Sequence, residues 1–355
     1  MRIAQIAPLF EAVPPKLYGG TERVVSFLTE ELVALGHEVT LFASGDSVTS
    51  AELEAVWPRA LRLDSSIRDQ IAPQMLLLEA VRRRSAEFDV MHFHLDYLPF
   101  SLFSRQATPF LTTLHGRLDL PELKPIFKAF PNAPVVSISD SQREPLPDAH
   151  YAGTVHHGLP AGLLTPQERV KPGYLAFLGR IAPEKGPDSA IRIARACEIP
   201  LRIAAKIDKA DQTYFDRVIL PMLRDGGVEM VGEISDAEKP AFLSGATALL
   251  MPIAWPEPFG LVMIEAMACG TPVVAFNRGS VPEIIDHGLT GYIVEDEAGA
   301  IAAVANLDRL SRARVRSGFM TRFTARRMAQ SYLSIYHDLA EQLQPSHAAL
   351  LEAAD

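Results

Sequence analysis

The chain has 355 residues, of which 48% are hydrophobic and 22% are charged. This length and composition are enough for two domains, each with its own apolar core. The net charge of -9 argues against broad binding to nucleic acid, which needs a basic surface. No run of about 18 apolar residues occurs, so the sequence offers no membrane-spanning helix. The first residues read as a strand and not as a signal peptide, and we therefore expect a cytoplasmic protein.

Short apolar strands alternate with helices along the first half of the chain. Strands are expected at 2–8, 39–44, 90–94, 110–115, 135–139 and 154–156, and helices at 21–35 and 67–85. A strand, helix, strand order needs a crossover connection and so predicts a parallel sheet. Residues 1–160 are therefore interpreted as a doubly wound, Rossmann-like domain.

A second series of the same kind follows a stretch rich in glycine and proline. That stretch, about 158–173, lacks periodicity and is interpreted as a linker. Strands are then expected at 174–178, 201–205, 228–231, 248–252, 272–276 and 291–294. Residues 171–323 thus form a second α/β domain. The last helix, about 324–345, carries an apolar stripe.

Three loops that lead from a strand into a helix carry candidate binding residues. The first is Tyr18-Gly19-Gly20, where paired glycines allow the backbone to approach an anion at a helix N-terminus. A tight turn with no ligand is the alternative. The required third glycine of a dinucleotide fingerprint is missing, which argues against a nicotinamide oxidoreductase.

The second loop begins at Gly179-Arg180 and runs through Lys185-Gly186 to a helix expected to begin at Pro187. Arginine suits bidentate contact with phosphate, and lysine supplies a compact positive charge. Two solvated cations are the alternative. Because the strand end, the helix start and both cations coincide, a diphosphate site is the favoured interpretation.

The third loop contains Glu257, between two prolines, and leads into a helix that contains Glu265. The amides of Phe259 and Gly260 lie at the start of this helix, where backbone donors lack partners within the helix. Two carboxylates and free amides suit a polyhydroxylated ligand. An ordinary helix start with two unrelated glutamates is the alternative.

Several histidines end apolar strands. His115 follows the strand 110–114, where its side chain can reach a cleft or serve the structure. His92, His94 and Asp96 alternate at strand spacing and share one face. This outline is that of a metal set, but we prefer a strand that runs into a cleft without a metal.

The motifs, in this order, resemble those of retaining GT-B glycosyltransferases of family 4. The most specific matches are Gly179-Arg180-Ile-Ala-Pro-Glu-Lys185-Gly and Glu257-Pro-Phe-Gly-Leu, which is followed by Glu265-Ala-Met-Ala-Cys-Gly-Thr-Pro-Val-Val. The resemblance spans nearly the whole chain. It implies two facing Rossmann-like domains with a sugar-nucleotide donor in the cleft, and a final helix that returns to the first domain.

The resemblance also implies a role for each matching residue. Arg180 and Lys185 should hold the donor diphosphate, and Glu265 should bind the ribose hydroxyls. Glu257 and the amides of residues 259–261 should hold the transferred sugar. The remaining expected contacts are His115 beside the sugar, Gly19 and Gly20 at the phosphates, Gly179 at the diphosphate loop, Leu261 at the sugar, and Val231 and Glu233 at the base. His157 and Ala205-Lys206 depart from the common family pattern.

The resemblance predicts a metal-independent transfer with retention of configuration, because protein cations can stabilise the leaving diphosphate. We expect no resident cofactor, and a UDP-sugar as donor ahead of a GDP-sugar. The acceptor is left open among a polysaccharide, a lipid-linked compound and a small molecule. A peripheral contact with a membrane is a further alternative, since Phe93, Phe100 and Phe103 lie in an apolar stretch, although core packing explains them as well. A sugar-nucleotide 2-epimerase and a non-catalytic nucleotide-sugar-binding protein remain alternatives.

Overall fold

The computed structural model describes residues 1–16 and 19–342 and divides the chain into two compact units. The first unit comprises Met1–Ile138, Arg143–Gly158 and the chain from Ala325 on. The second comprises Ser139–Gln142 and Leu159–Thr324. The segment 158–173, expected as a linker, therefore lies almost wholly in the second unit. It is tied there because the Leu159 N–H donates to the Phe323 carbonyl at 2.9 Å.

The first unit is built on a seven-stranded sheet in which every neighbouring pair is parallel. From edge to edge its strands are β3 (Glu52–Trp57), β2 (Glu38–Ser44), β1 (Arg2–Ile6), β4 (Val90–Phe93), β5 (Phe110–Thr113), β6 (Val135–Ser137) and β7 (Tyr151–Thr154). The order reverses direction between β1 and β4. This is the topological switch point, outside which ligands bind in doubly wound sheets.

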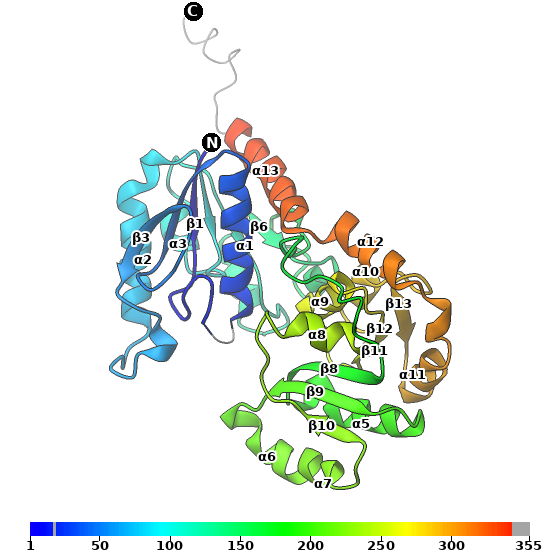
Figure 1. Cartoon of the computed structure of the whole chain (residues 1–355). Helices are drawn as coiled ribbons and strands as arrows, with labels where there is room; N and C mark the ends of the chain where they lie inside the picture. Colours follow the sequence, from blue (N-terminus) through cyan, green and yellow to red (C-terminus); the bar gives the residue numbers. More distant parts are fainter. Residues whose placement is uncertain (17–18, 343–355) are drawn as a thin grey trace, which may run out of the picture. The chain divides into compact units, whose positions relative to one another are not determined.

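Helices cover this sheet. They are α1 (Gly20–Ala34), α2 (Ile71–Arg84), α3 (Phe100–Phe103), α4 (Leu123–Ala129) and α13 (Ala325–Gln342), with short 3-10 turns at Leu61–Leu63, Ser85–Glu87 and Ser141–Arg143. The last helix of the chain, α13, lies beside the first, α1 (Figure 1). Its buried Tyr332 and Tyr336 face β4, so the C-terminal helix completes the fold of the first unit. The predicted end of this helix, beyond residue 342, lies outside the described residues.

The apolar stretch after β4 belongs to the core. Phe93, Phe100 and Phe103 are fully buried and pack together, whereas Tyr97 and Leu98 are exposed. Core packing thus accounts for Phe93, Phe100 and Phe103, and a contact with lipid is not needed to explain them. Among the described residues, no helix combines the length and the apolar character needed to cross a membrane.

The second unit repeats the design with a six-stranded parallel sheet. Its strands run in the order β10 (Val228–Met230), β9 (Leu201–Lys206), β8 (Tyr174–Arg180), β11 (Ala246–Met251), β12 (Val273–Phe276) and β13 (Gly291–Val294). Here the switch point lies between β8 and β11.

The helices of the second unit connect these strands. They are α5 (Pro187–Ala196), α6 (Gln212–Tyr214), α7 (Leu220–Leu223), α8 (Lys239–Ser244), α9 (Leu261–Ala268), α10 (Val281–Ile284), α11 (Glu297–Val304) and α12 (Arg312–Arg322), with a π-helical turn at Phe215–Ile219 and 3-10 turns at Pro183–Lys185, Lys209–Asp211 and Leu307–Arg309. Helix α5 begins at Pro187 as predicted, because proline fits the first position of a helix.

Two expectations about the first sheet are wrong. Strand β3 was not foreseen, because Glu52–Trp57 is a half-exposed edge strand without a clean apolar face. The strand expected at 154–156 lies at Tyr151–Thr154 instead, where β7 forms the other edge. Edge strands are difficult to recognise because only one side of the backbone and part of the side chains are covered.

Candidate active site

The two loops with the strongest sequence signals follow the two strands at the switch point of the second sheet. Strand β8 leads into the loop with Lys185, and β11 leads into the loop with Glu257. Parallel neighbours end at the same edge, so the loops meet there. They are joined directly by a backbone bond, in which the Ala254 N–H donates to the Glu184 carbonyl at 2.9 Å.

Lys185, Glu257 and Trp255 form one compact cluster at this edge. The Lys185 ammonium donates to Glu257 Oε2, and the Trp255 indole N–H donates to the same oxygen at 2.8 Å. The ammonium also lies 5.1 Å from the centre of the Trp255 ring, close enough for a cation–π contact. The Glu257 side chain is only 14% exposed. Its Oε2 is committed to the protein, because it accepts from both Lys185 and Trp255.

Close backbone packing fixes the Glu257 loop. Gly279 has a φ of 56°, and a Cβ there would lie 2.4 Å from both the backbone N and the carbonyl O of Glu257. The next residue, Ser280, donates its N–H to the Glu257 carbonyl at 3.0 Å and its hydroxyl to the Phe259 carbonyl at 2.8 Å. Gly260, with a φ of 77°, turns the chain into α9. The segment 256–260 is therefore positioned by glycines that cannot be replaced without movement.

Arg180, the last residue of β8, is surrounded by carboxylates. Its guanidinium lies 3.0 Å from Glu184, 3.6 Å from Asp208 and 3.5 Å from Asp211. In the sheet register Arg180 lies opposite Lys206, which itself pairs with Asp208 at 2.9 Å. Two cations therefore stand side by side at the ends of β8 and β9, and both are paired with carboxylates.

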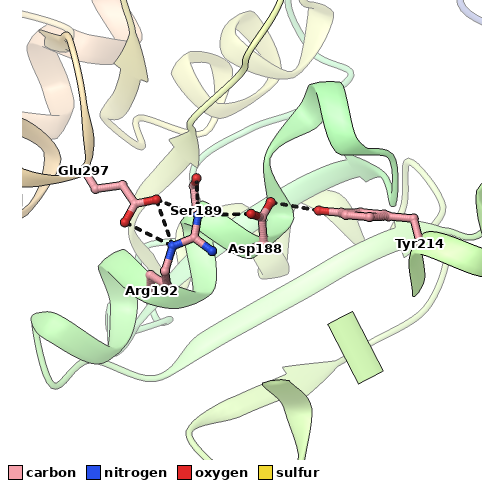
Figure 2. A network of polar contacts seen from close by, with 5 residues as sticks. All are labelled: Asp188, Ser189, Arg192, Tyr214 and Glu297. Atoms are coloured by element: carbon pink, nitrogen blue, oxygen red, sulfur yellow. Dashed lines mark hydrogen bonds and ion pairs between the residues drawn. The ribbon is translucent and has the colours of Figure 1, made fainter. Parts of the chain in front are cut away.

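An ionic network holds the helix that follows this loop (Figure 2). Arg192 pairs with Asp188 at 3.0 Å and with Glu297 at 2.7 Å. The Tyr214 hydroxyl donates to the other Asp188 oxygen at 2.8 Å. Burial raises the pKa of Asp188, but hydrogen bonds from Tyr214 and Arg192 outweigh it and lower the pKa below its ordinary value. The first turn of α5 is thus fixed relative to α6 and α11.

Glu265 lies inside α9 and is almost completely buried, at 2% exposure. Its carboxylate accepts a hydrogen bond from the Lys239 ammonium at 2.8 Å, and Lys239 also pairs with Asp236 at 3.1 Å. Sequence analysis missed Lys239. The available signal was a single cation at the start of the otherwise apolar helix α8, and it is weak because such lysines are usually solvated.

The expected base-binding residues lie in the loop after β10. Val231 and Glu233 are exposed, and Gly232 between them has a φ of 86°. The Val231 N–H donates to the Ile203 carbonyl at 2.8 Å, which ties the loop to β9. Asp236, the partner of Lys239, belongs to the same loop. The loop expected at the base and the carboxylate expected at the ribose are therefore connected through one lysine.

In the first unit, Gly19 and Gly20 mark the start of α1, as predicted. Gly19 is required by close packing, since a Cβ there would lie 2.8 Å from Pro15 Cβ and 3.2 Å from a carboxylate oxygen of Glu22. Gly20 has open space around its Cα. Tyr18, named in the same motif, lies outside the described residues.

His115 ends a continuous chain of buried hydrogen bonds in the first unit. Its Nε2 lies 2.8 Å from His94 Nδ1, and His94 Nε2 lies 2.9 Å from Gln5 Oε1. The Gln5 amide nitrogen donates to the Tyr336 hydroxyl at 3.0 Å, and that hydroxyl lies 2.7 Å from His92 Nδ1. The hydrogen bonds therefore connect α13, through Gln5 of β1 and His94 at the end of β4, to His115, which follows β5.

The orientation of Gln5 sets the proton positions on His94 and His115. Because Gln5 Oε1 can only accept, His94 Nε2 carries a proton and His94 Nδ1 accepts one from His115 Nε2. His115 Nδ1 is then an acceptor, and among the described residues it is buried without a partner. Burial lowers the pKa of His115 to about 3 and the pKa of His94 well below its ordinary value, so both rings are neutral.

The outline of a metal set at His92, His94 and Asp96 is explained by these bonds. Both ring nitrogens of His92 and of His94 have hydrogen-bond partners in the protein. Asp96 lies beyond the end of β4 and is exposed. Within the parts of the chain that the structure describes, no three histidine, cysteine or acidic side chains converge as a metal site.

Two family models match the chain. One, described as "Glycosyl transferases group 1", matches residues 165–317, and the other, "Glycosyltransferase Family 4", matches residues 18–144. The chain belongs to the group 1 glycosyltransferases. The glycosyltransferase family expected from the motifs is thereby confirmed, and with it that the protein is an enzyme, while retention of configuration stays a prediction.

Curated relatives of this glycosyltransferase match it over part of their length. A D-inositol 3-phosphate glycosyltransferase of Pseudarthrobacter chlorophenolicus is 34% identical over 140 residues, which cover 37% of this chain and 33% of the relative. A glycogen synthase of Mycobacterium tuberculosis is 34% identical over 183 residues, covering 47% and 44%. The chain thus spans less than half of the length of these curated relatives.

Solved structures share the fold of the glycosyltransferase. AviGT4, which takes part in avilamycin A biosynthesis, aligns with a TM-score of 0.72 at 24% identity and covers 96% of this chain and 98% of its own. Sucrose-phosphate synthase from Thermosynechococcus elongatus aligns with a TM-score of 0.76 at 20% identity, covering 95% and 98%. The GT-B class, with two parallel-sheet units, is confirmed.

Several of the expected site residues lie together in the second unit. Lys185, Glu257 and the start of α9 lie at one switch point, and Arg180 ends a strand of the same switch point. Glu265 follows in α9, paired with Lys239. The binding roles expected for these residues stay predictions, as do those of Gly19, Gly20 and His115 in the first unit.

Proposed function

We propose that this glycosyltransferase moves a sugar from a nucleoside-diphosphate sugar to a hydroxyl of an acceptor, with retention of anomeric configuration. The observation that carries the proposal is the Lys185–Glu257–Trp255 cluster at the switch point of the second sheet. A cation suits phosphate and a carboxylate suits sugar hydroxyls, and the two lie together at the edge where doubly wound sheets bind ligands.

The donor diphosphate is proposed to bind Arg180 and Lys185. Lysine has three N–H donors, so Lys185 can keep its bond to Glu257 and still donate to phosphate oxygens. Arg180 has five donors in a planar fork, and it can exchange a carboxylate for a phosphate of similar geometry. As the bond to the sugar breaks, negative charge grows on the diphosphate, and fixed cations stabilise that transition state more than the ground state.

Glu257 and the amides of residues 259–261 are proposed to hold the transferred sugar. Glu257 is not assigned as a covalent nucleophile, because Oε2 is already bound by Lys185 and Trp255. Glu265 is proposed to accept the ribose hydroxyls. With these roles filled, we infer a front-face transfer in which the leaving phosphate accepts the proton of the acceptor hydroxyl, and in which the two cations replace a divalent metal.

A UDP-sugar is the donor we favour. The proposal draws on a solved relative of the same fold, HepE of Anabaena, which was crystallised with UDP and glucose and aligns with a TM-score of 0.70 at 16% identity. The names of the curated relatives include inositol-phosphate, malate and glycogen acceptors, so for this chain we propose only that the acceptor supplies a hydroxyl.

The test is a thermal-unfolding screen of the intact chain with UDP, GDP and ADP, each with and without attached sugars. A ligand at about 100 times its dissociation constant adds about 2.7 kcal/mol of stability. We expect the largest gain with a UDP-sugar, and the gain should persist in EDTA. A failure of every nucleotide to stabilise the chain would overturn the proposed donor class, and an inverted anomeric product in an NMR assay would overturn retention.

A further inference from the structure

The ion pair between Lys239 and Glu265 lies almost wholly inside the second unit. The side chains are 12% and 2% exposed, and their charged atoms lie 2.8 Å apart. In α9 the neighbours of Glu265, Ile264 and Ala266, are fully buried. A buried pair of this kind gains little stability over apolar side chains of similar size. The pair therefore calls for a role other than stability.

Lys239 is placed to connect two segments. It is the first residue of α8 and reaches Glu265 in α9 on one side and Asp236, in the loop after β10, at 3.1 Å on the other. The loop end is itself fixed, because Glu238 accepts the N–H of Ser235 at 2.8 Å and its hydroxyl at 2.6 Å. One ammonium group thus sets the position of the buried carboxylate relative to the loop.

Charge and geometry define what this arrangement can do. The ammonium stabilises the ionised form of Glu265, and an ionised carboxylate accepts hydrogen bonds but donates none. Lys239 is bound to Oε1, which restricts the rotation of the carboxylate. A fixed, ionised acceptor selects for ligands with neighbouring hydroxyl donors and discriminates against analogues that lack one, because the buried acceptor then loses its partner.

We propose that Lys239 is a positioning residue of the nucleoside subsite, which orients Glu265 to read the ribose hydroxyls and anchors the loop after β10 through Asp236. The proposal rests on the proposed function, since it takes a nucleoside diphosphate as the ligand. Lys239 acts through Glu265 and does not touch the ligand. Its removal should therefore change the preference for ribose over deoxyribose more than it changes phosphate binding.

The experiment compares the binding of UDP and 2′-deoxy-UDP by calorimetry in four forms of the full chain. These are the unchanged protein, Lys239→Met, Lys239→Arg and the control Lys171→Met, which removes an exposed lysine of the same unit. Methionine keeps the length of the side chain and removes the charge. The unchanged protein and Lys171→Met should prefer UDP by about 10-fold or more, the lower range for a hydrogen bond to a charged group.

Lys239→Met should bind UDP about 10-fold more weakly and lose the preference over 2′-deoxy-UDP. Lys239→Arg, which keeps the charge, should retain part of the preference. Binding of inorganic pyrophosphate should be equal in all four forms. A Lys239→Met protein with an unchanged preference would overturn the proposal, as would an unchanged protein that binds UDP without any preference.

A second variant covers the case in which Lys239→Met does not fold. Asp236→Asn changes a side chain that is 39% exposed and removes the charge that pairs Lys239 with the loop. This variant should fold normally and bind UDP about 3-fold more weakly, with the preference for UDP over 2′-deoxy-UDP intact. Equal UDP affinity in Asp236→Asn and the unchanged protein would reject the anchoring of the loop. If no nucleoside diphosphate binds the unchanged protein, the proposed function fails rather than the role of Lys239.

Discussion

Gly279→Ala is the sharpest test of the idea that backbone packing positions the Glu257 loop. The added Cβ would lie 2.4 Å from two backbone atoms of Glu257, whereas ordinary contacts begin at 3.4 Å. The loop must therefore move by about 1 Å, the difference between the two distances. A misplacement of about 1 Å at reacting groups costs about 100-fold in rate. The left-handed φ of 56° adds about 1–2 kcal/mol of strain for alanine.

The matched control is Gly288→Ala in the same unit. Gly288 has a φ of 76° and no atom within 4 Å of its hypothetical Cβ, so alanine there carries the backbone strain without the collision. In urea unfolding, the free energy of unfolding of both variants should be lower by about 1–2 kcal/mol. The collision should lower that of Gly279→Ala further.

The assay is the rate of nucleoside diphosphate release from the donor identified in the binding screen. Gly288→Ala should keep at least half of the turnover of the unchanged chain, and Gly279→Ala should lose about 100-fold. Equal activity of the two variants would show that the position of Glu257 does not depend on its close packing against Gly279.

Three further predictions concern charge and hydrogen bonding. Lys185→Met should lower turnover by about 100-fold, because it removes a donor to the leaving diphosphate, whereas Lys171→Met should not. His92, His94 and His157 are buried with lowered pKa values, so the folded chain stays neutral there while the unfolded chain takes up protons below about pH 6.5. The free energy of unfolding should therefore fall as the pH drops from 6.5 to 5, by about 1.4 kcal/mol per pH unit for each histidine. In urea unfolding, His157→Asn should reduce this pH dependence by the contribution of one histidine. Tyr214→Phe should destabilise the chain by about 1 kcal/mol in the same measurement, because Asp188 loses a hydrogen bond, while the exposed Tyr97→Phe should have no effect.

Sequence patterns predicted most of the central elements. Buried parallel strands such as β1, β8 and β12 are short apolar runs, and the switch from strand to helix at Pro187 is marked by local chemistry. The patterns failed at the edges of the first sheet, at β3 and β7. An edge strand is covered on one side only, so its side chains carry a weaker apolar signal.

The candidate site was predicted in parts. The motifs pointed to Arg180, Lys185, Glu257 and Glu265, and the structure shows Lys185 bound to Glu257 although 72 positions separate them. Lys239 and Gln5 were missed, since a single lysine or glutamine in an apolar segment looks like any solvated or core residue. Their importance depends on partners that lie 26 and 89 positions away.

Local sequence patterns specify the two α/β units, the parallel sheets and the loops that bear the cations and carboxylates, because periodicity, helix starts and glycines are local properties of the chain. Which charges meet depends on the tertiary fold. It paired Lys185 with Glu257 and Lys239 with Glu265, gave Arg180 three carboxylate neighbours, and joined His115 to Gln5 through His94. Those contacts depend on strand order and on the close packing of loops such as 256–260 against Gly279, which no spacing along the chain records.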